Sequence, residues 1–320
     1  MRSIPLFTLV LVACGGGTNS SSTLNDALAV DSSNPGSDAA PDGSTTARDP
    51  ALDGDATVTT ATAAIPGATA QRTLAATVFT PSIAGPRPLV VISPGFQLQR
   101  TQYTSYARHL ATWGFVVVLT DYAAGGGLFP NHTTLATDVP AVVDWALAQT
   151  SLAIDPQKIA LAGHSLGGKI SVYAASLDPR IKAVVGWDPV DSSNPSVAPE
   201  KMASLTAAIA VVGETTNGGG GGMPCAPTAD NFNTFYGAAP SPALAVTVTG
   251  ADHMDWVDDS SCGVCGFCSP GAAPAERARL VTKRVDVAWL RRYLLGDLAM
   301  DAWLDVPPEL AAGLVSIARR

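Results

Sequence analysis

The stretch "KIALAGHSLGGKISVYAASL", residues 158–177, joins an apolar β-branched run to a helix-like segment through a serine between glycines. The run 158–162 predicts a buried strand, and residues 166–177 predict an amphipathic helix. Between them, "GHSLG" fits G-x-S-x-G, a sharp turn that carries a nucleophilic serine when it joins a strand to a helix. The motif alone is weak, because a glycine turn can be purely structural. Its strand-to-helix context predicts that Ser165 is a nucleophile.

The same alternation of strand-like and helix-like segments continues along most of the chain. Strand-like runs lie at 57–65, 74–81, 88–93, 115–122, 158–163, 181–187, 207–213 and 243–250, and helix-like segments at 101–114, 136–149, 166–177 and 275–296. Near-continuous apolar strands separated by helices predict an α/β fold, with a mostly parallel sheet covered by helices on both faces. Ligands of such sheets bind at the carboxyl ends of the strands, so we expect the site there.

The composition limits the classes of function. The chain has 320 residues, of which 47% are hydrophobic and 14% charged, enough for one large core. The formal net charge of −8, with no basic stripe, argues against nucleic acid as a partner. No apolar run approaches the ~20 residues that a membrane-spanning helix needs.

The first residues have the layout of an export signal. "MRSIPLFTLVLVACGGG" places a charge before a short apolar stretch that ends at Cys14. We expect a signal peptide at 1–13, a flexible Ser-, Gly- and Asp-rich tether at 14–55 and one globular domain at 56–320. An ordinary signal peptide cut nearby is the alternative to the lipoprotein signal considered next.

The residues "LVAC", 11–14, resemble the lipobox of bacterial lipoproteins. That resemblance implies that Cys14 is lipidated, becomes the first residue and holds the chain to a membrane by acyl chains. Gly15 follows instead of aspartate, which in bacteria with two membranes suggests passage to the outer one. We therefore expect an exported protein of the bacterial cell envelope, lipid-anchored or secreted.

A serine nucleophile needs a base, and chain order selects one histidine of the four. His164 adjoins Ser165 and should point away from its hydroxyl, whereas His109 and His132 precede the nucleophile. In hydrolases built on this strand–serine–helix turn, the acid and then the histidine follow the serine. Only His253 does so, just past the strand-like run 243–250. The alternative is a surface histidine in the acidic loop "ADHMDWVDD".

Two carboxylates end strand-like runs between the serine and this histidine. Asp188 follows the run 181–187 and precedes Pro189, which stiffens the turn. Glu214 ends the next run, where many enzymes of this architecture carry the acid, but a glycine-rich loop follows it. Either residue could orient His253.

Backbone N–H groups at two turns could stabilise an oxyanion. One is the N–H of Leu166, directly after the nucleophile, and the other is that of Phe96, after the strand-like run and turn "PLVVISPGF". A plain Pro-Gly turn is the alternative at Phe96.

Four cysteines follow the lipobox cysteine: Cys225, Cys262, Cys265 and Cys268. The spacing "CGVCGFC" permits zinc or iron–sulfur ligation, but thiols of an exported chain oxidise, which favours two disulfides with three possible connectivities. A bond from Cys225 to the cluster would tie the loop after Glu214 to the loop that carries His253. We expect no cofactor and no metal.

Residues 70–296 resemble known serine hydrolases of the α/β-hydrolase fold. "VVISPGFQLQRTQYTSYARHLATWGFVVVLTDY" is similar to the front of bacterial cutinases and polyester hydrolases, whose aromatic at the Phe96 position supplies an oxyanion donor and lines the acyl site. "GHSLGGK", "GWDPVD", "CAPTADNFNTFY" and "GADHMDWVDD" resemble chlorophyllases in their order along the chain. In chlorophyllases the aspartate of the D-P-V segment is the acid, and platelet-activating factor acetylhydrolases and pancreatic lipases also carry it after this strand. The resemblance therefore favours Asp188, with Glu214 in reserve.

One departure limits what the resemblance implies, because chlorophyllases usually have arginine where this chain has Leu166. We expect ester chemistry on a small-molecule, lipid or polyester substrate, and nothing in the sequence indicates chlorophyll as that substrate. A peptidase or acyltransferase with the same three residues is an alternative. A non-catalytic binding lipoprotein on a hydrolase scaffold is another, although the presence of Ser165, Asp188 and His253 argues against it.

Overall fold

The computed structural model describes residues 48–69, 71–122, 130–219, 224–260 and 265–320. The expected signal peptide, Cys14, most of the expected tether and Cys262 lie outside these residues.

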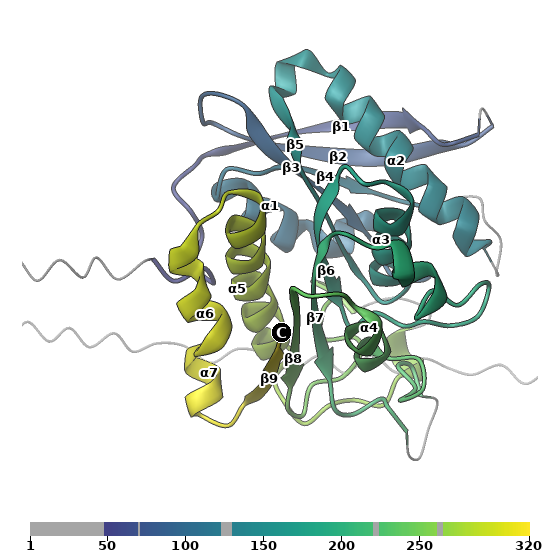
Figure 1. Cartoon of the computed structure of the whole chain (residues 1–320), viewed down its shortest axis with the longest axis vertical. Coiled ribbons are helices and arrows are strands. Elements are labelled where there is room, and N and C mark those ends of the chain that lie inside the picture. The colour runs from purple at the N-terminus through teal and green to yellow at the C-terminus, as the bar shows by residue number, and fades with distance from the viewer. Residues whose placement is uncertain (1–47, 70, 123–129, 220–223, 261–264) are drawn as a thin grey trace, which may run out of the picture. The chain divides into compact units, whose positions relative to one another are not determined.

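The described residues form a nine-stranded sheet at the centre of the domain (Figure 1). The strand order is β1-β2-β4-β3-β5-β6-β7-β8-β9. Strands β4, β3, β5, β6, β7 and β8 run parallel to one another, while β1, β2 and β9 join antiparallel. The strands are Val58–Pro66 (β1), Thr73–Pro81 (β2), Arg87–Ser93 (β3), Val116–Thr120 (β4), Ile154–His164 (β5), Ile181–Trp187 (β6), Ala208–Glu214 (β7), Ala243–Val248 (β8) and Val315–Arg319 (β9). The mostly parallel α/β sheet expected from the sequence is therefore confirmed.

Burial explains why the central strands are so apolar. Every residue of β4 and β7 is buried, because helices cover both faces of the sheet there. The edge strand β1 is threonine-rich and mostly exposed. The short terminal strand β9, which lies at the other edge, has no strong apolar run and was not expected.

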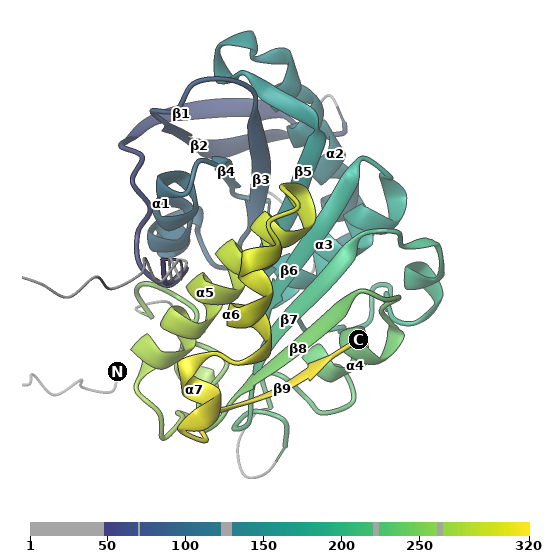
Figure 2. The same ribbon diagram turned by 60° about the vertical axis from the view of Figure 1, so that its left-hand side comes forward.

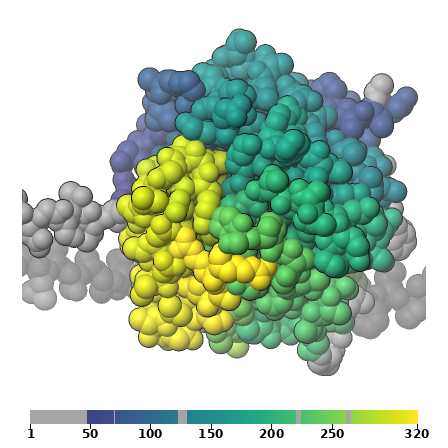
Figure 3. Space-filling model, in the orientation of Figure 1, coloured from purple at the N-terminus to yellow at the C-terminus, as the bar shows by residue number. Residues whose placement is uncertain are grey.

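Helices pack on both faces of the sheet (Figure 2). Helices α2, α3 and α4 bury their apolar residues with one face, and α1 and α5 with the other. The helices are Thr104–Thr112 (α1), His132–Ala148 (α2), Leu166–Leu177 (α3), Phe232–Ala238 (α4), Ala275–Leu294 (α5), Asp301–Asp305 (α6) and Pro308–Ala311 (α7). The space-filling view shows the C-terminal segments lying directly against the body of the domain (Figure 3).

The packed domain begins earlier than residue 56. Asp49 forms an ion pair with Arg284 of α5 (Nε–Oδ1 2.9 Å), and His109 of α1 hydrogen-bonds to Asp53 Oδ1 at 2.8 Å and to the Pro50 carbonyl at 2.9 Å. The sequence predicts that residues 48–55 belong to the tether, because they contain few apolar side chains. They are held instead by ion pairs and hydrogen bonds, which hydrophobic patterning does not detect.

No helix in the described ranges has both the length and the apolarity to cross a membrane.

Candidate active site

Ser165 stands at the sharp turn between β5 and α3. Its backbone has φ 53° and ψ −119°, a conformation that is costly for a residue with a side chain. Gly167 permits this turn, because a Cβ there would lie 2.0 Å from the Ser93 carbonyl oxygen at the end of β3. A Cβ on Gly163 would lie 2.5 Å from the backbone of Gly167. The two glycines of the motif therefore let the serine turn press against the end of β3.

The structure brings Ser165, His253 and Asp188 into one chain of hydrogen bonds. His253 Nε2 lies 2.9 Å from Ser165 Oγ, and His253 Nδ1 lies 2.6 Å from Asp188 Oδ2. The three residues are 9%, 5% and 0% exposed, respectively. Because a carboxylate only accepts, Nδ1–H of a neutral imidazole donates to Asp188 and Nε2 accepts from the serine hydroxyl. This is the proton arrangement that activates a serine oxygen.

Asp188 is held rigidly at the end of β6. Its φ is 40°, and its N–H donates to the Val212 carbonyl at 2.6 Å. Pro189 lies close to Gly168 of α3, where a Cβ would approach the proline ring to 2.9 Å. Burial raises the pKa of Asp188, and the hydrogen bond and charge of His253 oppose that rise.

Glu214 ends the neighbouring strand but turns to a different partner. Its carboxylate accepts from the N–H of Asn217 at 2.8 Å and from that of Thr216. Asn217 Oδ1 in turn accepts from the N–H of His253 at 2.7 Å. Burial, followed by the charge of Asp188, raises the pKa of Glu214 to about 7. Of the two candidate acids, Asp188 therefore hydrogen-bonds to the imidazole of His253. Glu214 instead supports the backbone of His253 through Asn217.

A second histidine supports the site from behind. His164 Nε2 lies 2.8 Å from the His253 carbonyl oxygen, and His164 Nδ1 lies 2.8 Å from Tyr103 Oη, which also accepts from the Gly95 N–H at 3.2 Å. Burial, followed by the charge of His253, holds the pKa of His164 well below its usual value, so the ring is neutral. A carbonyl only accepts, so Nε2 carries the proton and the Tyr103 hydroxyl donates to Nδ1. Sequence reasoning placed His164 away from the serine hydroxyl but missed this network, for which the sequence carries no periodic or motif signal.

The two candidate oxyanion donors flank Ser165 in the structure. Leu166 is the first residue of α3, where an N–H has no acceptor within the helix. Phe96 lies in the turn after β3, which the Leu98 N–H closes on the Gly95 carbonyl at 3.1 Å. Both residues line the same pocket as Ser165 and His253.

The cysteines close one side of this pocket. Cys225 and Cys268 form a disulfide with a Cα–Cα distance of 5.5 Å, across 43 residues of sequence. This bond ties the loop after β7 to the segment that follows His253, as the sequence suggested. Cys265 is also disulfide-bonded. Within the described residues no group of three or more His, Cys, Asp or Glu side chains is placed to hold a metal ion.

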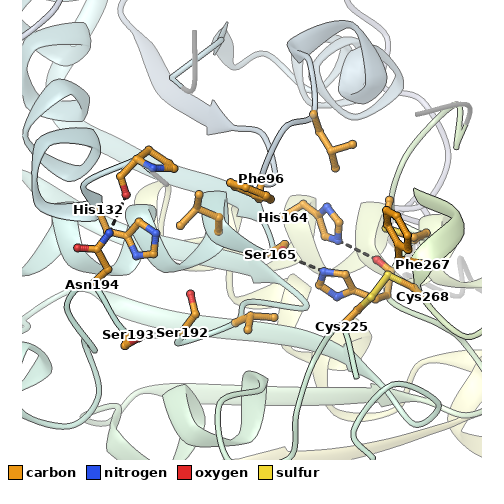
Figure 4. Close-up of a pocket in the computed structure, with 16 residues that line it drawn as sticks. Phe96, His132, His164, Ser165, Ser192, Ser193, Asn194, Cys225, Phe267 and Cys268 are labelled. Atoms are coloured by element: carbon orange, nitrogen blue, oxygen red, sulfur yellow. Dashed lines mark hydrogen bonds between the residues drawn. A yellow bond between two sulfur atoms is a disulfide. The ribbon is translucent and has the colours of Figure 1, made fainter. Parts of the chain in front are cut away.

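The pocket around Ser165 has a volume of about 560 Å³. Figure 4 shows two unlike ends, with Ser165 between them. At one end lie His132, Ser192, Ser193 and Asn194, and at the other lie Phe267 and the Cys225–Cys268 disulfide. The remaining lining is mostly apolar, including Leu98, Leu166, Val190 and Met254.

A strained serine at a strand-to-helix turn, bonded to a histidine that a buried aspartate orients, on a mostly parallel sheet, defines the class of α/β-hydrolases. The family model described as Chlorophyllase matches residues 51–309. The chain therefore belongs to the chlorophyllase family, a group of carboxylic ester hydrolases.

Individual relatives agree with this assignment. The chain is similar to Chlorophyllase-1 of Arabidopsis thaliana, with 30% identity over 72% of this chain and 82% of the plant protein. It is 27% identical to the bis(hydroxyethyl) terephthalate hydrolase of Streptomyces coelicolor, over 67% of this chain and 60% of that enzyme. Cutinase 1 of Thermobifida cellulosilytica is 23% identical, over 69% of this chain and 73% of the cutinase. The resemblance to chlorophyllases, with distant similarity to cutinases and polyester-related hydrolases, is confirmed.

Proposed function

We propose that this protein cleaves carboxylic esters through an acyl-enzyme intermediate on Ser165. The observation that carries the proposal is the unbroken hydrogen-bond chain from Asp188 through His253 to Ser165 Oγ. Membership of a family of ester hydrolases supports the same chemistry.

In the proposed reaction His253 moves one proton in each half. Nε2 takes the proton of Ser165 while Oγ attacks the ester carbonyl carbon, and Asp188 stabilises the imidazolium that forms. The N–H groups of Leu166 and Phe96 donate hydrogen bonds to the negatively charged carbonyl oxygen. Collapse breaks the bond to the alcohol oxygen, which takes the proton from His253 and leaves. A water molecule then repeats the sequence on the acyl-serine and releases the carboxylic acid.

The pocket favours esters with an apolar portion. Its exposed surface is mostly apolar, with Phe96, Leu98 and Val190 in the lining, and its volume of about 560 Å³ suits a small molecule or the end of a polyester chain. The names of the relatives include a cutinase and a terephthalate ester hydrolase, which supports this substrate class. We propose small-molecule, lipid or polyester esters as substrates. We also propose that Cys14 carries a lipid anchor at the bacterial cell envelope.

A fluorophosphonate probe tests the proposal, because it reacts with activated serines. We expect Ser165 to be labelled, and Ser165→Ala and His253→Ala each to lower kcat/KM for an aryl ester by on the order of 10³-fold or more. The hydroxyl of Ser176, in the same helix α3, donates to the Tyr173 carbonyl, so Ser176→Ala is the matched control and should change neither readout. Unchanged ester hydrolysis in Ser165→Ala would refute the assignment. Parallel assays on an anilide and with an alcohol acceptor distinguish a peptidase or an acyltransferase from an esterase.

A further inference from the structure

A buried lysine lies beside one end of the pocket. Lys169 of α3 has 0% exposure, and its Nζ lies 3.1 Å from His132 Nδ1 and 3.4 Å from Asp191 Oδ1. The same ammonium donates to the Ser192 carbonyl oxygen. Asp191 also accepts from the N–H of Val197 at 2.8 Å and that of Ala198 at 2.9 Å. An ammonium has three N–H groups, and here each has a partner.

The contact with Lys169 decides which nitrogen of His132 carries the proton. Burial lowers the pKa of Lys169, while the adjacent carboxylate of Asp191 favours its charged form. A protonated lysine only donates, so His132 Nδ1 must accept. Burial, followed by the charge of Lys169, lowers the pKa of His132 to about 4, so the ring is neutral near pH 7. The single ring proton therefore lies on Nε2.

The Nε2–H of His132 is available to a molecule in the pocket. His132 lines the pocket at the end opposite Phe267 (Figure 4). Its backbone is fixed at the start of α2, where its N–H donates to the Asn194 carbonyl at 3.2 Å. Among the described residues, Nε2 has no hydrogen-bond partner. It does not belong to the fully buried polar atoms that lack a partner, so it remains accessible. The ring therefore presents an N–H donor, and not an acceptor, to the cavity.

We propose that His132 Nε2–H binds a second carbonyl oxygen of the substrate, distinct from that of the ester bond that is cleaved. The inference rests on the proposed ester hydrolysis and names the substrate class: keto esters and diesters. A neutral carbonyl is favoured over a carboxylate, because the charge of Lys169 is already balanced by Asp191. The opposite end, with Phe267 and the Cys225–Cys268 disulfide, takes the apolar portion of the molecule.

Matched ester substrates test this assignment. Each pair consists of an apolar ester and the same ester with one methylene replaced by a ketone, such as p-nitrophenyl pentanoate and p-nitrophenyl 4-oxopentanoate. The ketone is moved along the acyl chain in one series and along the alcohol in another. We expect the wild-type enzyme to prefer the keto ester at one position by roughly three- to tenfold in kcat/KM, as one neutral hydrogen bond would produce.

Two variants at residue 132 separate donation from mere bulk. His132→Leu removes the donor, so the ratio of the two kcat/KM values should fall to about one. His132→Gln can accept from Lys169 through its oxygen and donate to the pocket through its nitrogen, so the preference should persist. Phe267→Leu, at the other end, is the control and should change both substrates alike. Melting curves establish that each variant is folded before its ratio is interpreted.

The outcomes also distinguish this inference from the proposed function. If the wild-type enzyme hydrolyses the esters but prefers no keto ester at any position, the inference is wrong and the proposed function stands. The inference is equally wrong if folded His132→Leu keeps the preference. If the wild-type enzyme hydrolyses no ester of either series, the proposed function itself fails.

Discussion

Two buried carboxylates, Asp188 and Glu214, lie at the ends of the adjacent strands β6 and β7, and their hydrogen bonds indicate different roles. Asp188 Oδ2 lies 2.6 Å from His253 Nδ1, whereas Glu214 accepts from the backbone of Thr216 and Asn217. The imidazolium formed during ester cleavage therefore has Asp188 as its direct counter-charge. Glu214 supports the backbone of His253 through Asn217, whose Oδ1 accepts from the His253 N–H.

Substitution of each carboxylate by its amide tests this division. Asp188→Asn should lower kcat by on the order of 10³- to 10⁴-fold, because an amide can hold His253 in the wrong tautomer. Glu214→Gln should lower kcat by less than about tenfold, since a pKa of about 7 already leaves roughly half of the Glu214 carboxyl groups neutral near pH 7. Steady-state kinetics on an aryl ester measure both. A larger loss in Glu214→Gln than in Asp188→Asn would show that the acid is on β7.

At the scale of elements, one chain of hydrogen bonds joins four segments around the site. Gly95 follows β3, Tyr103 ends the 3-10 turn Arg100–Tyr103 before α1, and His164 ends β5. Their bonds run from the Gly95 N–H to the His253 carbonyl through Tyr103 and His164. The turn that carries Phe96 and the loop that carries His253 are thus fixed relative to each other.

Tyr103→Phe removes the hydroxyl that links Gly95 to His164 in this chain of hydrogen bonds. The buried Nδ1 of His164 then loses its donor, which costs about 1–3 kcal/mol and should lower Tm. We also expect a lower kcat with a nearly unchanged KM, because both loops act on the transition state. Circular dichroism melts and ester kinetics provide the two readouts.

Tyr106→Phe is the matched control for this change. In the described part of the chain the Tyr106 hydroxyl is buried without a hydrogen-bond partner, and its ring stacks on Trp187 with centroids 4.4 Å apart. The loss of this hydroxyl should leave kcat unchanged, and it should either leave Tm unchanged or raise it. Equal effects of the two substitutions would mean that the Tyr103–His164 bond does not position the loops.

At the scale of the whole molecule, residues 48–55 fasten the beginning of the domain to α1 and α5. Arg284 lies between Asp49 and Glu309, with its Nη1 2.6 Å from Glu309 Oε2. The N–H of Gly54 donates to Thr112 Oγ1 at 2.7 Å. The stable unit therefore includes polar residues that precede the first strand.

Two truncations locate this boundary. A chain that begins at residue 48 should keep the Tm and the kcat/KM of the full-length protein. A chain that begins at residue 56 loses the Asp49–Arg284 and His109–Asp53 contacts, and we expect its Tm to fall by about 2–4 °C for each kcal/mol of stabilisation lost. Calorimetry measures the difference. Identical melting of the two truncated chains would contradict a structural role for residues 48–55.

The lipid anchor is proposed from the segment "LVAC" at residues 11–14. We expect the mature protein to begin at a lipidated Cys14 and to partition with membranes. Mass spectrometry of the mature N-terminus decides this point. Cys14→Ser should release a soluble protein or leave an uncleaved precursor. An unmodified terminus at another residue would show an ordinary secreted protein and leave the proposed chemistry intact.

The sequence was sufficient to predict the fold class and to select Ser165 and His253, two residues that the structure brings within hydrogen-bond distance. Apolar runs and helical periodicity are local, and they reappear as the eight expected strands and the four expected helices. The motif around Ser165 is also local, since its glycines are demanded by close contact with the end of β3. His253 followed from chain order alone, because no other histidine comes after the serine.

Only the tertiary structure decided which side chains meet across the sheet. A carboxylate follows β6 and another ends β7, and the residues alone left both open, although the family resemblance favoured Asp188. The geometry of two turns directs Asp188 rather than Glu214 to His253. Four cysteines allowed three pairings, of which folding selects Cys225–Cys268 for one bond. The contact of Lys169 with His132 joins residues 37 apart, and the network through Tyr103 and His164 spans a longer stretch of chain. Such long-range polar contacts leave no periodic trace in the sequence, because each depends on where two separate elements pack.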